Sequence, residues 1–569
     1  MNPIRWFESA GASGELVSLD RFIDPHLFAT QSGAYGGAFR IRGIDPECLS
    51  DAELANVSAR LVQAMRLLPE DCSLYQILIR RRGCPLPQSR YADSANEVVA
   101  ETQCKRHEYL STRPLGTVEL YCTICIYPSK ARKQPQPGEH AAVTERLVRR
   151  LRSTLTVVAQ NLSELIGMEQ LDCHGIARLY GYLANLEVEL IRQRLASRDH
   201  IGRQLARSPV RWHSEGLEIG RSHAKLFSLI QRPNATRPHL FGELIRLDAD
   251  LVLVLESQRQ SAAATRKCVS SHQSFKDLFR HSLLSILAHA KGGREIAKSA
   301  NSVAADKAVD DLGSVVDDIE NRGLTYTQTS LIGMLHSRNK NELDDQMAQV
   351  HRVFSPSEAA VLEERIGSLS AYYSLFPAAA RYGESFNVRR FWLREDHLAN
   401  LSLVYAPYPG TPESEALEDE ALAIFETRDR TLFYFDSYLN DLRGMLVIGS
   451  PRRGKSFLIN FLMDMEPKYG GFIFIFDIGG SYESTVLKHG GRVVRFGLDG
   501  PRLNPLALPP TEENQEFVYR LVRMLLVKGG ATILPTDERD LYERVKQLFR
   551  LEPEVRRLQS LVLTPELEP

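Results

Sequence analysis

The most constraining feature of this sequence is a short segment, Gly449–Ser456, which reads Gly-Ser-Pro-Arg-Arg-Gly-Lys-Ser. It fits the pattern G-x-x-x-x-G-K-[ST], in which a glycine-rich turn points backbone N–H groups at phosphate oxygens. The apolar segment Gly444–Gly449 before it predicts a strand, and the apolar-faced segment Ser456–Met463 after it predicts a helix. Because strand, turn and helix follow one another directly, we expect an α/β domain with an anion site at a helix N-terminus.

The residue types in this loop suit a nucleoside triphosphate with magnesium. Lys455 is expected to reach the β- and γ-phosphates, and the Ser456 hydroxyl to hold Mg²⁺. Pro451 favours extended backbone at Ser450, and Arg452 stands where many such loops have glycine. A tight strand–helix turn with an incidental lysine is the alternative. The predicted nucleotide contacts are Gly449, Ser450, Pro451, Arg452, Arg453, Gly454, Lys455, Ser456 and Phe457, with Lys455 as the catalytic residue and Ser456 as the metal ligand.

A second strand-like segment, Phe472–Asp477, ends in an aspartate. This segment comes directly after the phosphate-loop helix, and no glutamate follows Asp477. Both features argue against its being the acidic strand that orients magnesium. We therefore interpret Asp477 as a strand-end residue near the site, which helps to position Lys455, Ser456 or a metal-bound water.

At 569 residues the chain is long enough for three or four domains of roughly 150 residues each. An acidic stretch that starts with turn residues, Gly410–Glu420, predicts a boundary before the phosphate loop. The expected organisation is an N-terminal α/β domain (1–130), a mainly helical region (131–235), a second α/β region (236–409), a linker (410–425) and a partial α/β nucleotide-binding domain (426–569).

Hydrophobic periodicity predicts individual elements within these regions. In the first domain we expect strands over 37–42, 73–79 and 117–127, with helices from Asp51 and over 95–110. Further on, we expect strands over 240–256 and 326–336, and helices over 260–320, 340–375, 512–528 and 536–549.

Charge and cysteine content exclude several classes of protein. Lys and Arg number 70 against 71 Asp and Glu, whereas a binder of naked nucleic acid usually carries a basic excess. The sequence shows neither a secretory signal nor an apolar run of about 18 residues, so we expect a cytosolic or peripheral protein.

Cys122 and Cys125 resemble half a zinc knuckle or a redox pair, but they lie in a predicted strand without a second pair. We interpret them as structural.

Several blocks in order resemble the ATPase core of the CagE/TrbE/VirB family, the energising ATPases of type IV secretion and conjugation machines. The blocks are Gly449–Ser456, Phe476–Glu483, Gly490-Gly491 and Leu503–Leu506, with weaker likeness upstream at Gly36–Gly43, Leu78–Arg82 and Phe376–Arg390. The resemblance is strong from about 430 to 508 and weak in the first 400 residues.

This resemblance implies a RecA-like αβα domain with a helical insertion at 510–550, bound ATP and Mg²⁺, and a homo-oligomer built as a hexamer or from dimers. It also implies other secretion subunits as partners, at the cytoplasmic face of the bacterial inner membrane, and a motor that couples ATP hydrolysis to substrate export or pilus assembly. Of the functional residues that the resemblance implies, those with a matching position in this sequence are Gly449, Gly454, Lys455, Ser456 and Asp477.

Nothing in Leu551–Pro569 resembles the family's later acidic strand. We therefore expect either a truncated form of a longer protein or a second chain that supplies the rest. The alternative function is therefore a nucleotide-binding, non-hydrolysing assembly subunit. A DNA translocase of the HerA/FtsK kind is disfavoured by the even charge balance, as is DNA binding in general.

Overall fold

The computed structural model of the chain describes residues 13–47, 49–128, 139–187, 195, 200–233, 235–260, 326–381, 384–438, 444–496, 504–530 and 533–563. The helices predicted over 260–320 lie almost wholly outside these residues. The chain divides into two compact units, Met1–Phe472 and Ile473–Pro569, and each is described by itself.

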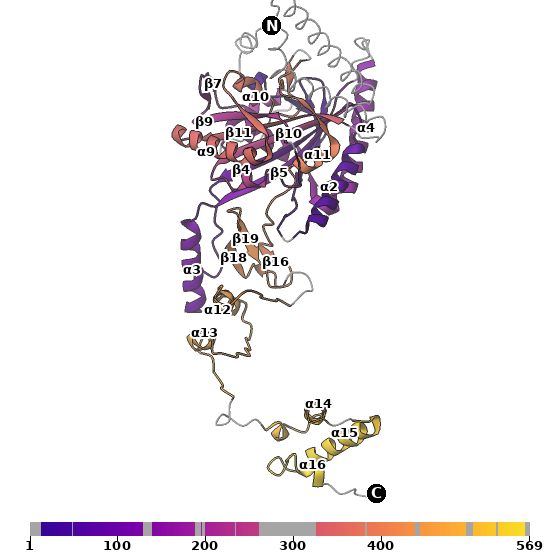
Figure 1. Cartoon of the computed structure of the whole chain (residues 1–569), viewed down its shortest axis with the longest axis vertical. Coiled ribbons are helices and arrows are strands. Elements are labelled where there is room, and N and C mark those ends of the chain that lie inside the picture. The colour runs from indigo at the N-terminus through magenta and orange to yellow at the C-terminus, as the bar shows by residue number, and fades with distance from the viewer. Residues whose placement is uncertain are drawn as a thin grey trace, which may run out of the picture. The chain divides into compact units, whose positions relative to one another are not determined.

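The first unit is built on a 13-stranded sheet whose paired strands are all antiparallel (Figure 1). Its main order is β1-β2-β3-β5-β4-β10-β11-β9-β8-β7. Because β4 pairs with β10, the regions 1–130 and 236–409 contribute neighbouring strands to one sheet. The strands are β1 Leu19–Phe22, β2 Leu27–Thr30, β3 Tyr35–Ile41, β4 Cys72–Arg82, β5 Gly116–Ile126, β6 Met168–Gln170, β7 Val210–His213, β8 Gly216–Ile219, β9 Ser222–Gln231, β10 Asp250–Arg259, β11 Tyr326–Ser337, β12 Ala360–Glu364 and β15 Phe391–Arg394.

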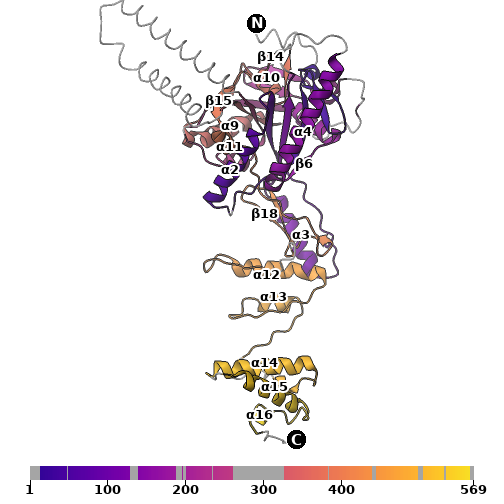
Figure 2. The same cartoon turned by 90° about the vertical axis from the view of Figure 1, so that its right-hand side faces the viewer.

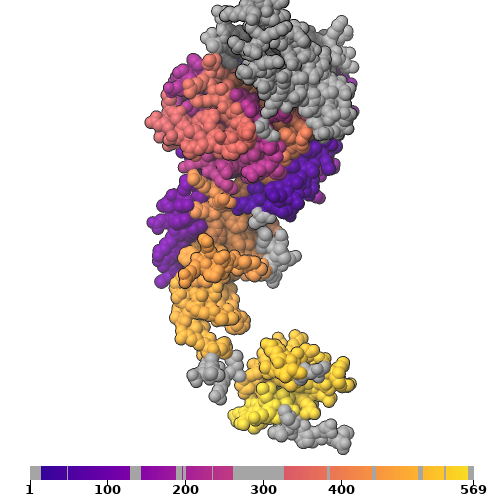
Figure 3. Space-filling model, viewed as in Figure 1, coloured from indigo at the N-terminus to yellow at the C-terminus, as the bar shows by residue number. Residues whose placement is uncertain are grey.

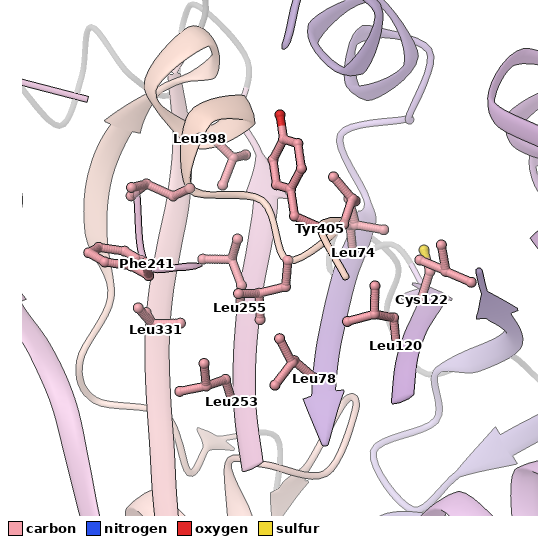
Figure 4. Close-up of a cluster of buried hydrophobic side chains, with 14 of the residues drawn as sticks. Leu74, Leu78, Leu120, Cys122, Phe241, Leu253, Leu255, Leu331, Leu398 and Tyr405 are labelled. Atoms are coloured by element: carbon pink, nitrogen blue, oxygen red, sulfur yellow. The ribbon is translucent and has the colours of Figure 1, made fainter. Parts of the chain in front are cut away.

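Helices cover both faces of this sheet, so its central strands are apolar on both sides. On β10, Leu251, Leu253 and Leu255 enter one core, and Val252 and Val254 enter the other. Figure 2 shows α4 lying along the sheet, and Figure 4 shows the first core, where leucines of β4, β10 and β11 meet. The first face is covered by α2 Asp51–Arg66, α4 Glu139–Ile166, α9 Lys340–Phe354 and α11 Glu395–Leu401, and the second by α5 Cys173–Asn185, α6 Ile201–Leu205 and α10 Ser368–Tyr373.

The element pattern predicted for the N-terminal domain is confirmed. Helix α2 begins at Asp51 because Ser50 caps it, accepting from the Glu53 amide while the Glu53 carboxylate accepts from Ser50. Its buried residues include Val57, Leu61 and Met65, which recur at helical spacing. The strands β3, β4 and β5 and the helix α3 Glu97–Ser111 also occur where they were predicted.

The prediction of a mainly helical region over 131–235 is wrong in its last third, where β7, β8 and β9 form a meander. Strand β9 lies between β11 on one side and β8 and β12 on the other. Because both of its faces are buried, it lacks the alternation that marks a half-exposed strand. Two smaller corrections are that 242–246 forms a 3-10 helix before β10, and that β12 separates the two helices predicted over 340–375.

The chain that leads to the phosphate loop folds against the sheet in two short hairpins. The residues predicted as a linker, 410–425, contain β16 Glu413–Ser414, β17 Asp419–Glu420 and the start of β18 Ala423–Glu426, which pairs with β19 Leu432–Phe435. Helix α12 Lys455–Met465 follows and contacts α3. In the space-filling view the purple α3 segment lies beside the orange segment that contains these hairpins (Figure 3). The domain boundaries stay a prediction.

The second unit has a small helical core. Its helices are α13 Glu483–Lys488, α14 Glu512–Lys528, α15 Pro535–Phe549 and α16 Ser560–Leu563. Apolar residues of α14 and α15, among them Val518, Val522, Val545 and Leu548, pack together. The two helices predicted within 510–550 are therefore confirmed, and Thr511 caps the first one.

The predicted strands 444–449 and 472–477 are not strands in the described part of the chain. Their side chains are exposed, Leu446 and Ile448 by 82% and Phe476 by 87%. A parallel strand needs neighbours that hydrogen-bond to it and layers that cover both faces, and these segments have neither among the described residues. The RecA-like sheet therefore stays a prediction.

Candidate nucleotide-binding site

The predicted phosphate loop leads directly into α12, whose first residue is Lys455. Gly454 occupies the N-cap position with φ 89°, and no side chain caps the helix. The first amide N–H groups of a helix have no partner within it, and together with the helix dipole they attract an anion. A Cβ on Gly454 would meet nothing within 4 Å, so glycine is needed here for its backbone angle.

Arg452 is the unusual residue of the loop. Its φ is 62°, in the left-handed region that glycine adopts without penalty, and it stands where many such loops have glycine. The loop therefore keeps a glycine-type backbone although an arginine stands there. This conformation costs an L-residue about 1–2 kcal/mol in conformational free energy. The exposed Arg452 and Arg453 add positive charge beside the turn.

The side chain of Lys455 folds back over the turn. Its ammonium donates to the carbonyl oxygens of Gly449 at 2.8 Å and Ser450 at 3.0 Å. Its aliphatic carbons lie 3.4 and 3.5 Å from where a Cβ on Gly449 would stand. The loop thus holds a positive charge at the helix N-terminus, where phosphate oxygens can take over from the two carbonyls.

The remaining predicted contacts have exposed side chains. Ser450, Pro451, Ser456 and Phe457 are exposed, Phe457 by 80%. Among the described residues no group of three or more His, Cys, Asp and Glu side chains could hold a metal ion. The Ser456 hydroxyl still fits Mg²⁺, since this ion keeps several waters and takes its other ligands from substrate phosphates.

Asp477 belongs to the second unit, whereas the phosphate loop belongs to the first. Its carboxylate accepts a hydrogen bond of 3.0 Å from the backbone N–H of Tyr482, which closes a turn just before α13. Its predicted place near Lys455 and Ser456 stays a prediction.

The anchoring of the hairpin before the loop was not predicted. Arg80, a fully buried residue of β4, donates to the backbone oxygens of Leu247 at 2.6 Å and Asp429 at 3.2 Å. Arg246 donates to the Asp429 carboxylate at 2.7 Å. Asp429 lies in the β18–β19 turn, so both arginines fix this hairpin to the sheet. The sequence signal that could have indicated this anchoring is the run Arg80-Arg81-Arg82 at the end of an apolar strand.

The interpretation of Cys122 and Cys125 as structural is confirmed. Both are buried on β5, and their spacing of three places them in the cores on opposite faces of the sheet. Burial raises the pKa of the Cys122 thiol to about 12 and that of Cys125 well above its usual value. Such thiols stay protonated, which suits neither a redox pair nor a zinc site.

No helix in the described ranges combines the length and the hydropathy that a bilayer crossing requires.

The chain is similar to known proteins of type IV secretion systems. Residues 26–134 match a family model described as "Type IV secretion system ATPase VirB4/TrbE, N-terminal domain". The type IV secretion system protein virB4 of Bartonella quintana is 20% identical over 96% of this chain and 69% of its own length. Protein virB4 of Rhizobium radiobacter is 23% identical over 95% of this chain and 67% of its own length. The chain is thus similar to VirB4 proteins of type IV secretion systems over almost its whole length, and its residues 26–134 match the N-terminal domain of the VirB4/TrbE family.

Proposed function

We propose that this chain is an ATP-binding motor subunit of a bacterial type IV secretion or conjugation system, which couples ATP hydrolysis to substrate export or pilus assembly. The observation that carries the proposal is the glycine-turned loop at the N-terminus of α12 with the Lys455 ammonium held across it. The similarity to VirB4 proteins supports the secretion context.

The chemistry of the site follows from this geometry. The amides of the loop and the first turn of α12 bind phosphate oxygens, and Lys455 leaves the carbonyls of Gly449 and Ser450 to neutralise the β- and γ-phosphates. The Ser456 hydroxyl would hold Mg²⁺, and the ion would supply neutralisation of the phosphate charge. Asp477 is proposed to orient Lys455, Ser456 or a metal-bound water. Because phosphoryl transfer depends on positioning and charge, these groups hold the γ-phosphate for attack by water.

The proposed partners are other type IV secretion subunits at the cytoplasmic face of the inner membrane, together with further copies of this chain in a hexamer or in dimers. The formal net charge of −1 gives no support to a role in binding DNA.

The test is nucleotide binding and phosphate release by the full chain and by Lys455→Ala. Removing the lysine takes away charge-assisted hydrogen bonds, so MgATP affinity should fall about 10- to 100-fold and turnover should be lost. Lys340→Ala is the matched control, because Lys340 is likewise the first residue of a helix, α9, but lies in no glycine-rich loop.

Undiminished turnover in Lys455→Ala would contradict the proposal. Saturable MgATP binding by the wild-type chain without phosphate release would instead support the non-hydrolysing assembly subunit.

A further inference from the structure

Arg106, a half-buried residue of α3 in the N-terminal domain, contacts the elements around the phosphate loop. Its Nε donates to the backbone oxygen of Ile424 on β18 at 2.9 Å. Its guanidinium carbon lies 5.6 Å from the ring centre of Phe425 and 5.7 Å from that of Phe461 on α12. Both distances are within the range of a cation–π interaction. One side chain therefore joins three elements.

Phe461 belongs to the face of α12 that docks the helix. Leu458, Phe461, Leu462 and Met465 recur at helical spacing and pack against the β18–β19 hairpin, where the Phe461 ring lies 5.7 Å from that of Phe425. On the same helix Phe461 is six residues from Lys455, a rise of about 9 Å. Because a short helix moves as a rigid body, the contacts of this face set the direction of the loop at its N-terminus.

The hairpin cannot move independently of the sheet. Arg80 and Arg246 hold its turn at Asp429, and Arg113 of the Thr112–Leu115 connection pairs with Glu426 of β18 at 2.9 Å. Arg106 is thus placed between a fixed hairpin and the helix that begins with Lys455. The Arg106 guanidinium is partly removed from water, and this burial lowers its pKa.

We infer that Arg106 is a positioning residue for the phosphate loop, through which the N-terminal domain sets the affinity of the site for MgATP. The inference rests on the proposed function. A lysine cannot replace Arg106, because the planar guanidinium both lies over aromatic rings and donates in a fixed direction, whereas an ammonium is a point charge on a flexible stem. A partner that displaced α3 would therefore change the nucleotide site through the contact of Arg106 with Phe461 on α12.

The test measures the Kd of a fluorescent ATP analogue with Mg²⁺ for the full chain. Arg106→Ala should raise the Kd about five- to tenfold, which corresponds to the loss of a partly desolvated cation–π contact and its hydrogen bond. Arg106→Lys should recover less than half of that loss. Arg149→Ala is the matched control, since Arg149 is a helical arginine whose partner, Glu145, lies on its own helix α4. It should bind like the wild type.

A double-mutant cycle separates positioning from loss of folding. If Arg106 acts through Phe461, Arg106→Ala combined with Phe461→Ala should bind no more weakly than the weaker single variant. The melting temperature of each variant is measured in parallel. If an alanine variant does not fold, the cycle is repeated with Arg106→Lys and Phe461→Leu.

Two results would overturn the inference while the proposed function stands. One is wild-type affinity for MgATP in Arg106→Ala under conditions in which Lys455→Ala has lost binding. The other is a double variant, Arg106→Ala with Phe461→Ala, whose increase in Kd equals the product of the two single increases. Failure of the wild-type chain to bind MgATP would instead overturn the proposed function itself.

Discussion

At the scale of the residue, His336 shows how burial determines the charge of a side chain. It lies on β11 in the interior, and its Nε2 is within hydrogen-bond distance, 3.2 Å, of the Tyr182 hydroxyl. Burial lowers the pKa of His336 to about 4, with nearby Asp250 opposing the shift and Arg82 adding to it. The native protein therefore holds this imidazole uncharged at neutral pH.

His336 predicts a dependence of stability on pH. Its pKa is about 4 in the folded chain and about 6.5 in the unfolded chain, so between these values the unfolded state binds more protons. The free energy of unfolding should therefore decrease as the pH falls from about 6.5 to about 4, by up to about 3 kcal/mol from this group.

Urea unfolding of His336→Gln at pH 7 and pH 5 checks this expectation. The variant loses the titration, so its deficit in free energy of unfolding relative to the wild type should shrink at the lower pH. His351→Gln, at an exposed position of α9, is the control. A deficit that is equal at both pH values would contradict the role assigned to His336.

At the scale of the element, the β18–β19 hairpin depends on a buried arginine of another strand. Arg80 supplies donors to two backbone carbonyls, one in the connection before β10 and one in the hairpin turn. Both hydrogen bonds are buried. The orientation of the hairpin is thus a property of β4 as much as of its own sequence.

Arg80→Met keeps the length of the side chain and removes both donors. Leaving two buried carbonyls unpaired should lower the free energy of unfolding by about 2–4 kcal/mol. Arg81→Met is the matched control on the same strand, because Arg81 points to the opposite face and forms a partly exposed pair with Glu119, worth about 1 kcal/mol or less. Equal losses in the two variants, measured by urea unfolding, would argue against the anchoring role of Arg80.

At the scale of the whole molecule, the two units have separate cores. The residues of both cores against the large sheet precede Phe472, whereas the small helical core contains only residues from Leu506 onward. Each core therefore has its own source of hydrophobic stabilisation.

A chain that is shortened after Phe472 should keep the first unit folded. Its thermal transition, followed by circular dichroism, should stay cooperative and lie within a few degrees of the main transition of the full chain, because no core residue of the sheet is removed. A broad transition without cooperativity would show that the second unit contributes to the stability of the first.

Local signals account for the elements that sequence reasoning predicted correctly. Helix α2 is marked by the capping box at Ser50, helix α14 by Thr511 before it and Gly529 after it, and the second half of strand β11 by the apolar run Leu331–Leu335. The candidate site was likewise visible in Gly449–Ser456, because phosphate binding by a loop needs particular residues at adjacent positions. Strand β9 was missed, since burial on both of its faces removes its periodicity, and the four-residue strands β7 and β8 are too short for a clear alternation.

The sequence by itself determined where several of the described helices begin and end, and which glycine-rich loop is the candidate for binding phosphate. These properties depend on a few consecutive residues whose backbone angles and hydrogen bonds are settled locally. Only the tertiary structure decided that β4 and β10 are neighbours in one sheet, and that Arg106 lies over Phe461. Such contacts join residues hundreds of positions apart, and their free energy comes from burial and pairing that exist only once the chain has folded.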